Sequence, residues 1–170
     1  MQGQAAQAAR QLYRHAYRSN WLVKVRSLLA RRSCYLLDLA TVRADCLLQG
    51  YESIGTRVAP LQQIVGSAST GRCTDFDADF RPINGHNEAR WLAVAAARYR
   101  QRRLLPVSLI QIGSVYFVED GHHRISVANA LGEPMIEARV TLWQIQGGVG
   151  CTELLQNPAH LKRGHWLLQS

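Results

Sequence analysis

The residues best suited to chemistry stand together in one run, Asp120-Gly121-His122-His123-Arg124. Gly121 has no Cβ, so the backbone at this position can approach a ligand closely. Arg124 carries a planar guanidinium group that can hold phosphate oxygens through two hydrogen bonds. The two histidines add hydrogen-bond donors whose charge can change near neutral pH. We therefore expect this run to bind an anion, and a phosphate group in particular.

The elements on either side would place this run at the amino terminus of a helix. Residues 115–118 favour a strand, and the residues after His123 favour a helix that reaches Leu131 and closes at Gly132. The first N–H groups of a helix have no partners within the helix, and the helix dipole makes that end electropositive. A phosphate group binds well there. Asp120 is expected to cap the helix or to help hold a divalent metal ion.

A second group of chemically useful residues lies in the loop 72–82, where Asp75, Asp77 and Asp79 stand at alternate positions. Three carboxylates brought close together require neutralisation by Mg²⁺ or by a flanking arginine. Phosphoryl transfer uses such neutralisation, because the enzyme mainly positions groups and stabilises charge. We expect Asp75 or Asp77 to act as a metal ligand or general base, with Glu119 as an alternative carboxylate.

Plainer structural roles also fit both groups of residues. The first run could be a capped helix with surface histidines, and the acidic loop an ordinary turn with helix-capping aspartates. A zinc site is disfavoured, because His122 and His123 point in different directions on a helix and have no third ligand close in sequence. A calcium site of the EF-hand type is disfavoured, because the acidic loop has no glycine at the sixth position. Phe76 and Phe80 would anchor the loop to the core.

The first 50 residues favour helices, because apolar residues recur there at steps of three and four. Ser19-Asn20 would end the first helix and cap the second, and Gly50 would be the C-cap of the third. The expected helices cover residues 5–17, 21–29 and about 35–48.

This amino-terminal segment is also the most basic part of the chain. Residues 1–50 hold eight Lys or Arg against two acids, whereas residues 51–145 hold ten against nine. One interpretation of the asymmetry is a polyanionic partner, either nucleic acid or an acidic protein face; the other is a solvated helix face. The candidate DNA contacts are Arg10, Arg14, Arg18, Arg31 and Arg32.

After residue 50 the pattern changes to that of a small α/β domain. An edge strand would end near Pro60, followed by a turn at Gly66-Ser67 and a long loop that is expected to be functional or mobile. Gly113-Ser114 would join two strands tightly. The expected elements are a strand over 56–65, a loop over 67–87, a helix over 88–103, strands over 106–112, 115–118 and 135–145, and a short helix over 161–168.

Composition excludes several classes of protein. The apolar share of 47% is ordinary for a globular protein, and no segment approaches the roughly 18 consecutive apolar residues of a membrane span. The amino terminus lacks the pattern of a secretory signal, so we expect a cytoplasmic protein without a membrane partner. Its four cysteines are widely spaced and are expected to be free thiols: Cys34, Cys46, Cys73 and Cys151.

Residues 56–145 resemble the ParB/sulfiredoxin superfamily, in which a Gly-x-x-Arg turn between a strand and a helix grips nucleotide phosphates. The resemblance is carried by VAPLQQI at 58–64, LPVSLI at 105–110, YFVEDGHHR at 116–124 and the helix 125–131 with Gly132. It implies that the run from Asp120 to Arg124 binds the phosphates of a nucleotide.

The departures from the superfamily narrow the expected activity. Sulfiredoxins carry a catalytic cysteine where His122 stands here, so reduction of sulfinic acid is not expected. ParB partition proteins usually show Gly-Glu-Arg-Arg at this turn. They also continue into a helix-turn-helix domain, which we do not expect in the roughly 25 residues that follow the last predicted strand. Free-serine kinases of the superfamily have a turn more similar to Asp-Gly-His-His-Arg, which implies phosphoryl transfer.

Together these features predict an α/β (α+β) fold: a small mixed sheet with helices, of the ParB/sulfiredoxin type, preceded by a helical arm. The expected division is 1–50 for the arm, 51–146 for the domain and 147–170 for the tail. The expected ligand is ATP, ADP or CTP with Mg²⁺, bound with or without phosphotransfer or hydrolysis. The alternatives are a non-catalytic DNA-associated regulator and a metal-dependent nuclease. The sequence also allows a homodimer.

Overall fold

The structure is a computed structural model of the 170-residue chain, and it describes residues 2–30, 35–44 and 46–147. For residues 2, 18–30 and 147 it describes the backbone alone. The helices and strands in these ranges are α1 (Gln2–Ala30), β1 (Leu37–Asp38), α2 (Leu39–Ala44), β2 (Cys46–Pro60), β3 (Ile64–Ser67), α3 (Glu88–Tyr99), β4 (Val107–Ile112), β5 (Val115–Asp120), α4 (His122–Ala130) and β6 (Met135–Gly147). Short 3₁₀ turns cover Leu61–Gln63, Thr70–Arg72 and Gly85–Asn87.

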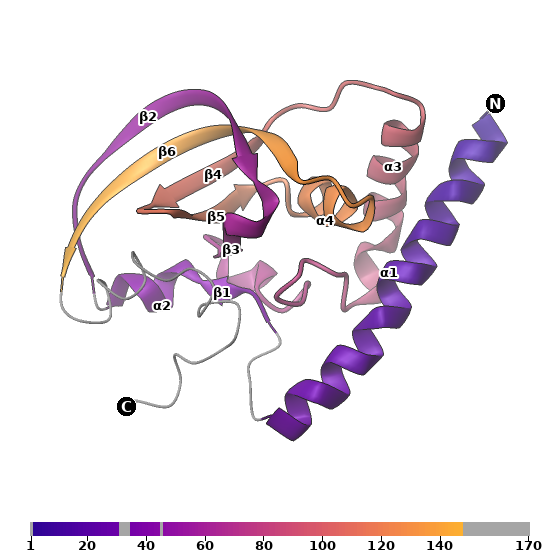
Figure 1. Cartoon of the computed structure of the whole chain (residues 1–170), viewed down its shortest axis with the longest axis horizontal. Helices are drawn as coiled ribbons and strands as arrows, with labels where there is room; N and C mark the ends of the chain where they lie inside the picture. The colour runs from indigo at the N-terminus through magenta and orange to yellow at the C-terminus, as the bar shows by residue number, and fades with distance from the viewer. Residues whose placement is uncertain (1, 31–34, 45, 148–170) are drawn as a thin grey trace.

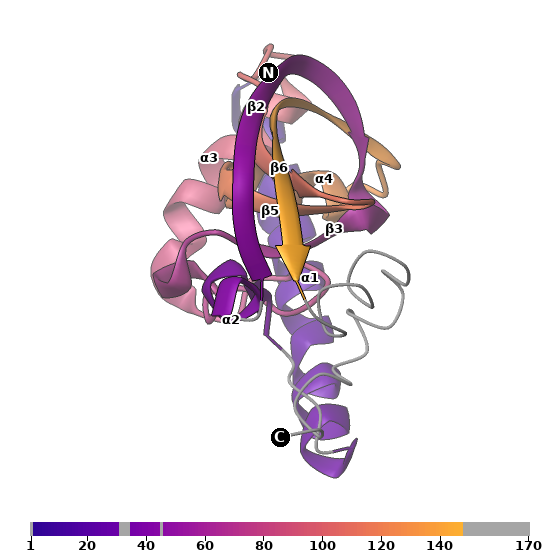
Figure 2. The same ribbon diagram turned by 90° about the vertical axis from the view of Figure 1, so that its left-hand side faces the viewer.

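The strands form one mixed sheet in the order β1-β3-β5-β4-β6-β2. β3 runs parallel to β1 and β5, and β4 runs parallel to β6, whereas β4–β5 and β2–β6 are antiparallel. β2 and β6 pair from Cys46 opposite Gly147 to Pro60 opposite Met135, and this long curved pair forms one edge of the sheet (Figure 2). The predicted α/β class is therefore confirmed.

Buried apolar side chains form one cluster on each face of the sheet. Neighbouring residues of a strand face opposite ways, so Leu109 packs with Ile125 of α4, whereas Ile110 packs with Val42 of α2. The sheet thus lies between α2 on one side and α4 on the other (Figure 1). This packing fixes the start of α4 against the carboxyl end of β5.

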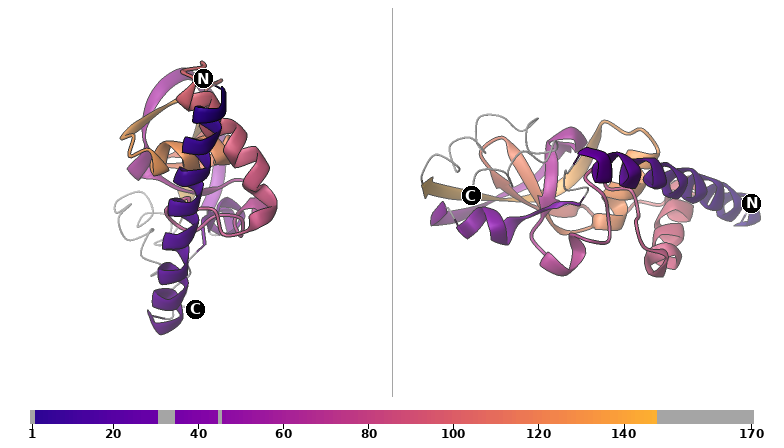
Figure 3. Two further views of the ribbon diagram at one scale, coloured as in Figure 1. Left: turned by 90° about the vertical axis from the view of Figure 1, so that its right-hand side faces the viewer. Right: turned by 90° about the horizontal axis from the view of Figure 1, so that it is seen from below.

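A third buried cluster joins α1, α3 and α4. Tyr13 of α1 meets Trp91 of α3 edge to face, with ring centroids 5.2 Å apart. The indole N–H of Trp91 donates a hydrogen bond of 2.8 Å to Ser126 Oγ of α4. α1 lies across α3, and its carboxyl end extends past the other helices (Figure 3).

Two helix predictions in the first 50 residues are wrong. α1 is continuous through Ser19-Asn20, because Ser and Asn are only moderately less favourable than alanine inside a helix and do not force a break. The helix predicted over 35–48 is reduced to α2. Residues before α2 pair with β3, and the stretch from Cys46 through Gly50 pairs with β6, so strand pairing overrides the local helical pattern. The sheet thus includes residues of the segment assigned to the arm.

The later elements follow the sequence more closely. Pro60 ends the edge strand β2, so the strand predicted over 56–65 is right only as far as Pro60, because Leu61–Gln63 forms a 3₁₀ turn. Gly113 turns the β4–β5 hairpin with a φ of +56°, and β6 begins at the expected residue. The predicted turn at Gly66-Ser67 is wrong, because both residues lie in the buried strand β3. The helix predicted over 88–103 ends at Tyr99, where Gln101 adopts a φ of +54°. The helix predicted over 161–168 lies outside the described residues.

Two further expectations are tested by the fold. Cys73 is buried and free, but Cys46 is disulfide-bonded, so the expectation of free thiols is wrong at Cys46. Cys34 and Cys151 lie outside the described residues. No helix in the described part of the chain is long and apolar enough to cross a membrane.

Candidate functional site

A cavity of about 670 Å³ opens where β5 ends and α4 begins. The whole predicted run, from Asp120 to Arg124, lines it, and so does Glu119. The remaining lining residues come from the loop after β3, from α3 and from the connection between α3 and β4: Ser69, Arg72, Arg90, Val94, Arg103, Leu104 and Leu105. The cavity therefore joins the phosphate-binding turn expected from the sequence to residues of three other segments.

Gly121 is required by the geometry of this turn. Its φ is +104°, a value that L residues with a side chain rarely adopt. A Cβ at this position would lie 2.5 Å from Cγ1 of Val107 and 3.1 Å from Nε of Arg124. The Gly121 carbonyl accepts the N–H of Ile125 at 3.0 Å, which starts α4. The glycine thus allows the chain to pass from β5 into α4 beside the cavity.

His123 is the polar group of the site that lacks partners. Only 8% of this residue is exposed, and neither Nδ1 nor Nε2 has a hydrogen-bond partner among the described residues. Its ring meets Phe76 edge to face at 5.4 Å. Burial, together with the nearby charges of Arg72 and Arg90, lowers the pKa of His123 to about 4, so the ring is neutral at pH 7. A buried polar group that has no hydrogen-bond partner lowers the stability of the folded protein.

His122 is turned toward the protein interior. Its Nε2 forms a 2.8 Å hydrogen bond with Oγ of Ser67, a fully buried residue of β3, and its ring stacks on Phe76. Burial, with Arg72 adding to it, lowers the pKa of His122 to about 4. The expectation that the histidines change charge near neutral pH is therefore wrong for both rings. Ser67 was missed by sequence reasoning, which placed it in a turn.

Arg124 is already held by the protein. Its Nη1 donates hydrogen bonds to the carbonyl oxygens of Leu105 (2.6 Å) and Pro106 (3.0 Å), and its Nη2 pairs with Oδ2 of Asp120 at 2.5 Å. The side chain is 17% exposed. Arg124 thus ties the α3–β4 connection to the turn, and Nε is the guanidinium nitrogen without a partner among the described residues. Asp120 makes no side-chain cap of α4, so the first of its two expected roles is wrong and the second, as a metal ligand, stays a prediction.

The other cationic groups of the cavity are Arg72, Arg90 and Arg103. Arg72 pairs with Asp75 at 3.1 Å and reaches Oδ1 of Asn87 at 3.5 Å. Arg90 is an exposed residue of α3 with no hydrogen bond or ion pair in the described part of the chain. These arginines are far apart in sequence, so no local pattern could bring them into the predicted site.

The acidic loop packs against the turn, but its carboxylates are engaged elsewhere. Phe76, fully buried, touches both histidine rings, which confirms its predicted anchoring role. Asp75 is buried between Arg72 and His86, with 3.2 Å between its Oδ1 and Nε2 of His86. Asp77 Oδ1 accepts the backbone N–H groups of Asp79 (2.9 Å) and Arg81 (2.7 Å).

This arrangement does not bring the predicted catalytic carboxylates together. Asp75 and Asp77 do not line the cavity, whereas Glu119 does. Burial raises the pKa of Asp77, whose Oδ2 has no hydrogen bond and lies 3.6 Å from Arg81. Within the described ranges, no three His, Cys, Asp or Glu side chains are grouped closely enough to hold a metal ion. A catalytic or metal role for Asp75 and Asp77 stays a prediction.

The predicted DNA contacts of the arm are only partly described. Arg10 and Arg14 are exposed on α1. Arg18 lies in α1, where only the backbone is described, and Arg31 and Arg32 lie outside the described residues. DNA binding by the arm therefore stays a prediction.

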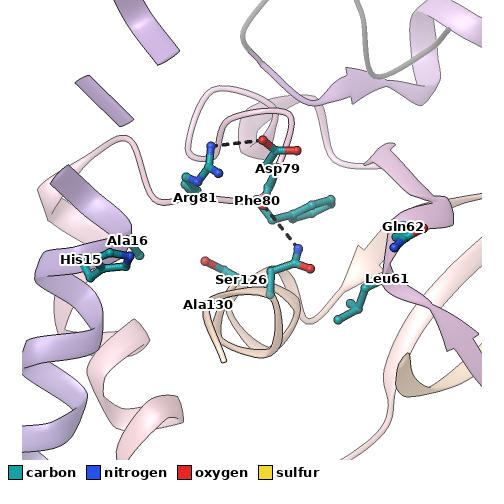
Figure 4. Close-up of a pocket in the computed structure, with 10 residues that line it drawn as sticks. His15, Ala16, Leu61, Gln62, Asp79, Phe80, Arg81, Ser126 and Ala130 are labelled. Carbon is teal, nitrogen blue, oxygen red and sulfur yellow. Dashed lines mark hydrogen bonds and ion pairs between the residues drawn. The ribbon is translucent and has the colours of Figure 1, made fainter. Parts of the chain in front are cut away.

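A second cavity, of about 390 Å³, lies between α1 and α4 (Figure 4). Its charged groups satisfy each other: Arg81 pairs with Asp79 at 3.1 Å. Asn129 donates a hydrogen bond to the backbone carbonyl of Asp79 at 3.4 Å. The one buried hydroxyl that lines it, on Ser126, already accepts from Trp91. This cavity shows no buried group in need of a ligand, which distinguishes it from the cavity at His123.

Fold and site together define a mixed α/β protein with an arginine-lined cavity at a strand-to-helix turn. No protein-family model and no curated protein sequence matches the chain. Among solved structures the chain is similar to sulfiredoxin from Arabidopsis thaliana, with a TM-score of 0.37 and 17% sequence identity, covering 61% of this chain and 94% of that chain. Because the TM-score is this low, the similarity carries no argument about the site.

Proposed function

We propose that the cavity at the start of α4 binds the phosphate groups of a nucleotide. The observation that carries the proposal is His123, whose two ring nitrogens are buried without partners at the wall of an arginine-lined cavity. A neutral imidazole offers one donor and one acceptor. A phosphate oxygen that accepts from the ring would relieve the cost of the buried, unpaired group.

The charges of the cavity favour an anion. Four arginines line it, against the carboxylates of Glu119 and Asp120, which gives a side-chain charge of about +2 with both histidines neutral. The amino-terminal end of α4 points its N–H groups and the positive end of its dipole at the same space. Arg90 and Nε of Arg124 are the guanidinium donors left for the ligand.

The rest of the cavity suits the remainder of a nucleotide. Val94, Leu104 and Leu105 provide an apolar wall, and a volume of about 670 Å³ is within the usual range for small-ligand sites. A neighbouring hollow of about 200 Å³ shares Leu104 and Leu105 and adds Met135. A nucleotide has anionic phosphates and a planar base, which match the arginine-lined part and the apolar wall of the cavity respectively.

Mg²⁺ would enter this site with the nucleotide. Magnesium is usually held by one or two carboxylates together with substrate phosphates, rather than by a complete protein cage. Glu119 and Asp120 fit that requirement, because both are exposed at the cavity wall. When bound, Mg²⁺ would neutralise phosphate charge beside the carboxylates. Phosphotransfer or hydrolysis would need an acceptor or water at the same place.

Isothermal titration with ATP, ADP, CTP and GTP, with and without Mg²⁺, tests the proposal. Arg90→Ala removes an exposed guanidinium of the cavity, and Arg139→Ala, an exposed arginine of β6 outside the cavity, is the matched control. We expect at least one nucleotide to bind the parent and Arg139→Ala alike, and Arg90→Ala to bind at least tenfold more weakly. Absence of binding by all four nucleotides, or equal loss in both variants, would refute the proposal.

A further inference from the structure

A run of arginines stands beside the proposed phosphate cavity. Residues 98–103 read RYRQRR and place four arginines within six positions; we call this stretch the arginine segment. It covers the end of α3 and the beginning of the connection to β4, which crosses the top of the molecule in Figure 1. All four arginines of the segment are exposed.

The backbone turns sharply within the arginine segment. Gln101 has a φ of +54°, and its N–H donates to the carbonyl of Arg98 at 2.8 Å. The N–H of Arg102 donates to the carbonyl of Ala97 at 3.0 Å. This pair of bonds closes α3 in the manner of a Schellman turn and leads the chain away from the helix. Backbone hydrogen bonds hold this turn, so they fix the backbone that carries the arginines.

Two of these arginines lack a neutralising partner among the residues that the structure describes. Arg98 pairs with Glu133, and Arg103 lies 4.0 Å from Glu137. Arg100 and Arg102 form no hydrogen bond or ion pair with any residue that the structure describes. Like charges at such close spacing repel one another unless a polyanion lies over them.

The arginine segment continues directly into the cavity. Arg103 belongs to both, and the next two residues, Leu104 and Leu105, line the cavity wall. Aromatic and apolar surface lies between the charges: Tyr99 is 41% exposed and Leu105 is 74% exposed. Basic side chains interspersed with an exposed aromatic ring are the combination that binds unpaired bases along a phosphate backbone.

We propose that the ligand is a single strand of nucleic acid, of which the cavity holds one phosphate and the arginine segment the neighbouring ones. A free nucleotide carries its phosphates at one place and would leave Arg100 and Arg102 unpaired. A flexible strand can enter the concave site and can stack a base on Tyr99. The inference rests on the proposed phosphate site, because Arg103 and the cavity form one surface.

Fluorescence anisotropy with labelled oligonucleotides of about 12 residues, a length within the range of single-strand sites, tests this inference. Single-stranded DNA, single-stranded RNA and a duplex of the same sequence are titrated at several salt concentrations. The double variant Arg100→Ala/Arg102→Ala is compared with Arg57→Ala/Arg139→Ala, which removes the same charge from exposed positions of β2 and β6, outside the cavity and the arginine segment. Urea denaturation checks that both variants fold as the parent does.

We expect the parent to bind single strands more tightly than the duplex, with an affinity that falls as salt is added. Loss of two phosphate contacts should reduce the slope of log K against log salt by about 1.4 in Arg100→Ala/Arg102→Ala and weaken binding at least tenfold. The Arg57→Ala/Arg139→Ala control should bind as the parent does. Comparison of single-stranded RNA with single-stranded DNA shows which sugar is preferred, and tight binding of either one supports the inference.

The outcomes separate this inference from the proposed function. If nucleotides bind in calorimetry but no oligonucleotide binds, the proposal of a nucleic-acid strand is wrong and the proposed phosphate site is retained. If neither kind of ligand binds, both proposals are wrong. Tighter binding of the duplex would overturn the inference. So would unchanged binding in Arg100→Ala/Arg102→Ala, or an equal loss in that variant and in Arg57→Ala/Arg139→Ala, since the arginine segment would then not be the surface that holds the strand.

Discussion

At the scale of single residues, the site is defined by what its side chains lack. His123 is buried with both ring nitrogens unpaired, whereas His122 beside it has Ser67 as a partner. Two adjacent histidines of the same turn therefore have different roles. His122 orients the turn against β3, whereas His123 lies at the cavity wall with both ring nitrogens buried and unpaired among the described residues.

Replacing His123 with leucine should leave the ligand-free protein as stable as the parent, within about 1 kcal/mol, or make it more stable. The reason is that leucine removes two unpaired buried nitrogens and keeps an apolar side chain against Phe76. Urea denaturation measures the change in the free energy of unfolding. A loss of several kcal/mol would show that the His123 ring has a structural partner and would count against the account.

Stability should fall as the pH is lowered from about 6.5 to about 4. Both histidines have a pKa of about 4 in the folded protein and an ordinary value of 6.5 when unfolded. Between these limits the unfolded chain binds more protons, so acid favours unfolding, by up to roughly 3 kcal/mol for each histidine. The raised pKa of Asp77 acts in the opposite sense. Comparison with His123→Leu isolates the histidine contribution, and an unchanged pH dependence in that variant would contradict the assignment.

Gly121→Ala should destabilise the protein by more than about 2 kcal/mol. The added Cβ would meet Val107 at 2.5 Å, and the φ of +104° would be strained as well. Two control positions separate the steric clash from the backbone strain. A Cβ at Gly132 would have free space but a φ of +72°, and a Cβ at Gly71 would have free space at a φ that is not positive. Alanine at Gly132 should cost about 1 kcal/mol, and at Gly71 almost nothing, in the same denaturation assay. Equal costs at all three positions would disprove the close approach.

At the scale of elements, the acidic loop acts as a support for the turn. Phe76 touches the rings of His122 and His123 from one side, and the carboxylate of Asp77 holds the backbone of its own loop. From the sequence, the carboxylates of this loop were the residues expected to take part in the site. In the structure, the aromatic ring of Phe76 makes the contact with the turn.

Asp77→Asn should therefore retain both folding and Mg²⁺-dependent nucleotide binding. The asparagine Oδ1 can accept the N–H groups of Asp79 and Arg81 as the carboxylate does, whereas Asp77→Ala leaves both without that acceptor and should cost about 2 kcal/mol. Calorimetry and urea denaturation of the two variants provide the comparison. If Asp77→Asn folded normally but lost the Mg²⁺ effect, the metal role expected from the sequence would be right.

The strand, turn and helix of the site could be predicted because they are local. Gly121 and the helix after it depend on neighbours in sequence, and the turn predicted there is found. The contributions of Ser67, Arg72 and Arg90 could not be predicted, because separate segments bring them to the cavity only after the sheet and α3 have packed. Only the last part of β2 was predicted, for the same reason: its partner β6 begins at Met135, far along the chain.

At the scale of the whole molecule, packing creates a charge distribution that no single segment has. α3 and the loop after β3 bring arginines to the turn between β5 and α4, and the connection that leaves α3 carries the arginine segment. The sequence placed the basic character in the first 50 residues. In the folded chain, a concentrated basic surface also forms around the cavity.

The central claim is that a phosphorylated ligand becomes the missing partner of His123. Nitrogen NMR of the imidazole rings, recorded as ADP is added, observes this directly. We expect the His123 ring signals to shift in the parent and the pKa of His123 to rise above about 4, because a nearby negative charge favours the protonated ring. Arg90→Ala should reduce both effects at the same ADP concentration. Unchanged His123 signals at ADP concentrations that saturate the protein in calorimetry would contradict the account.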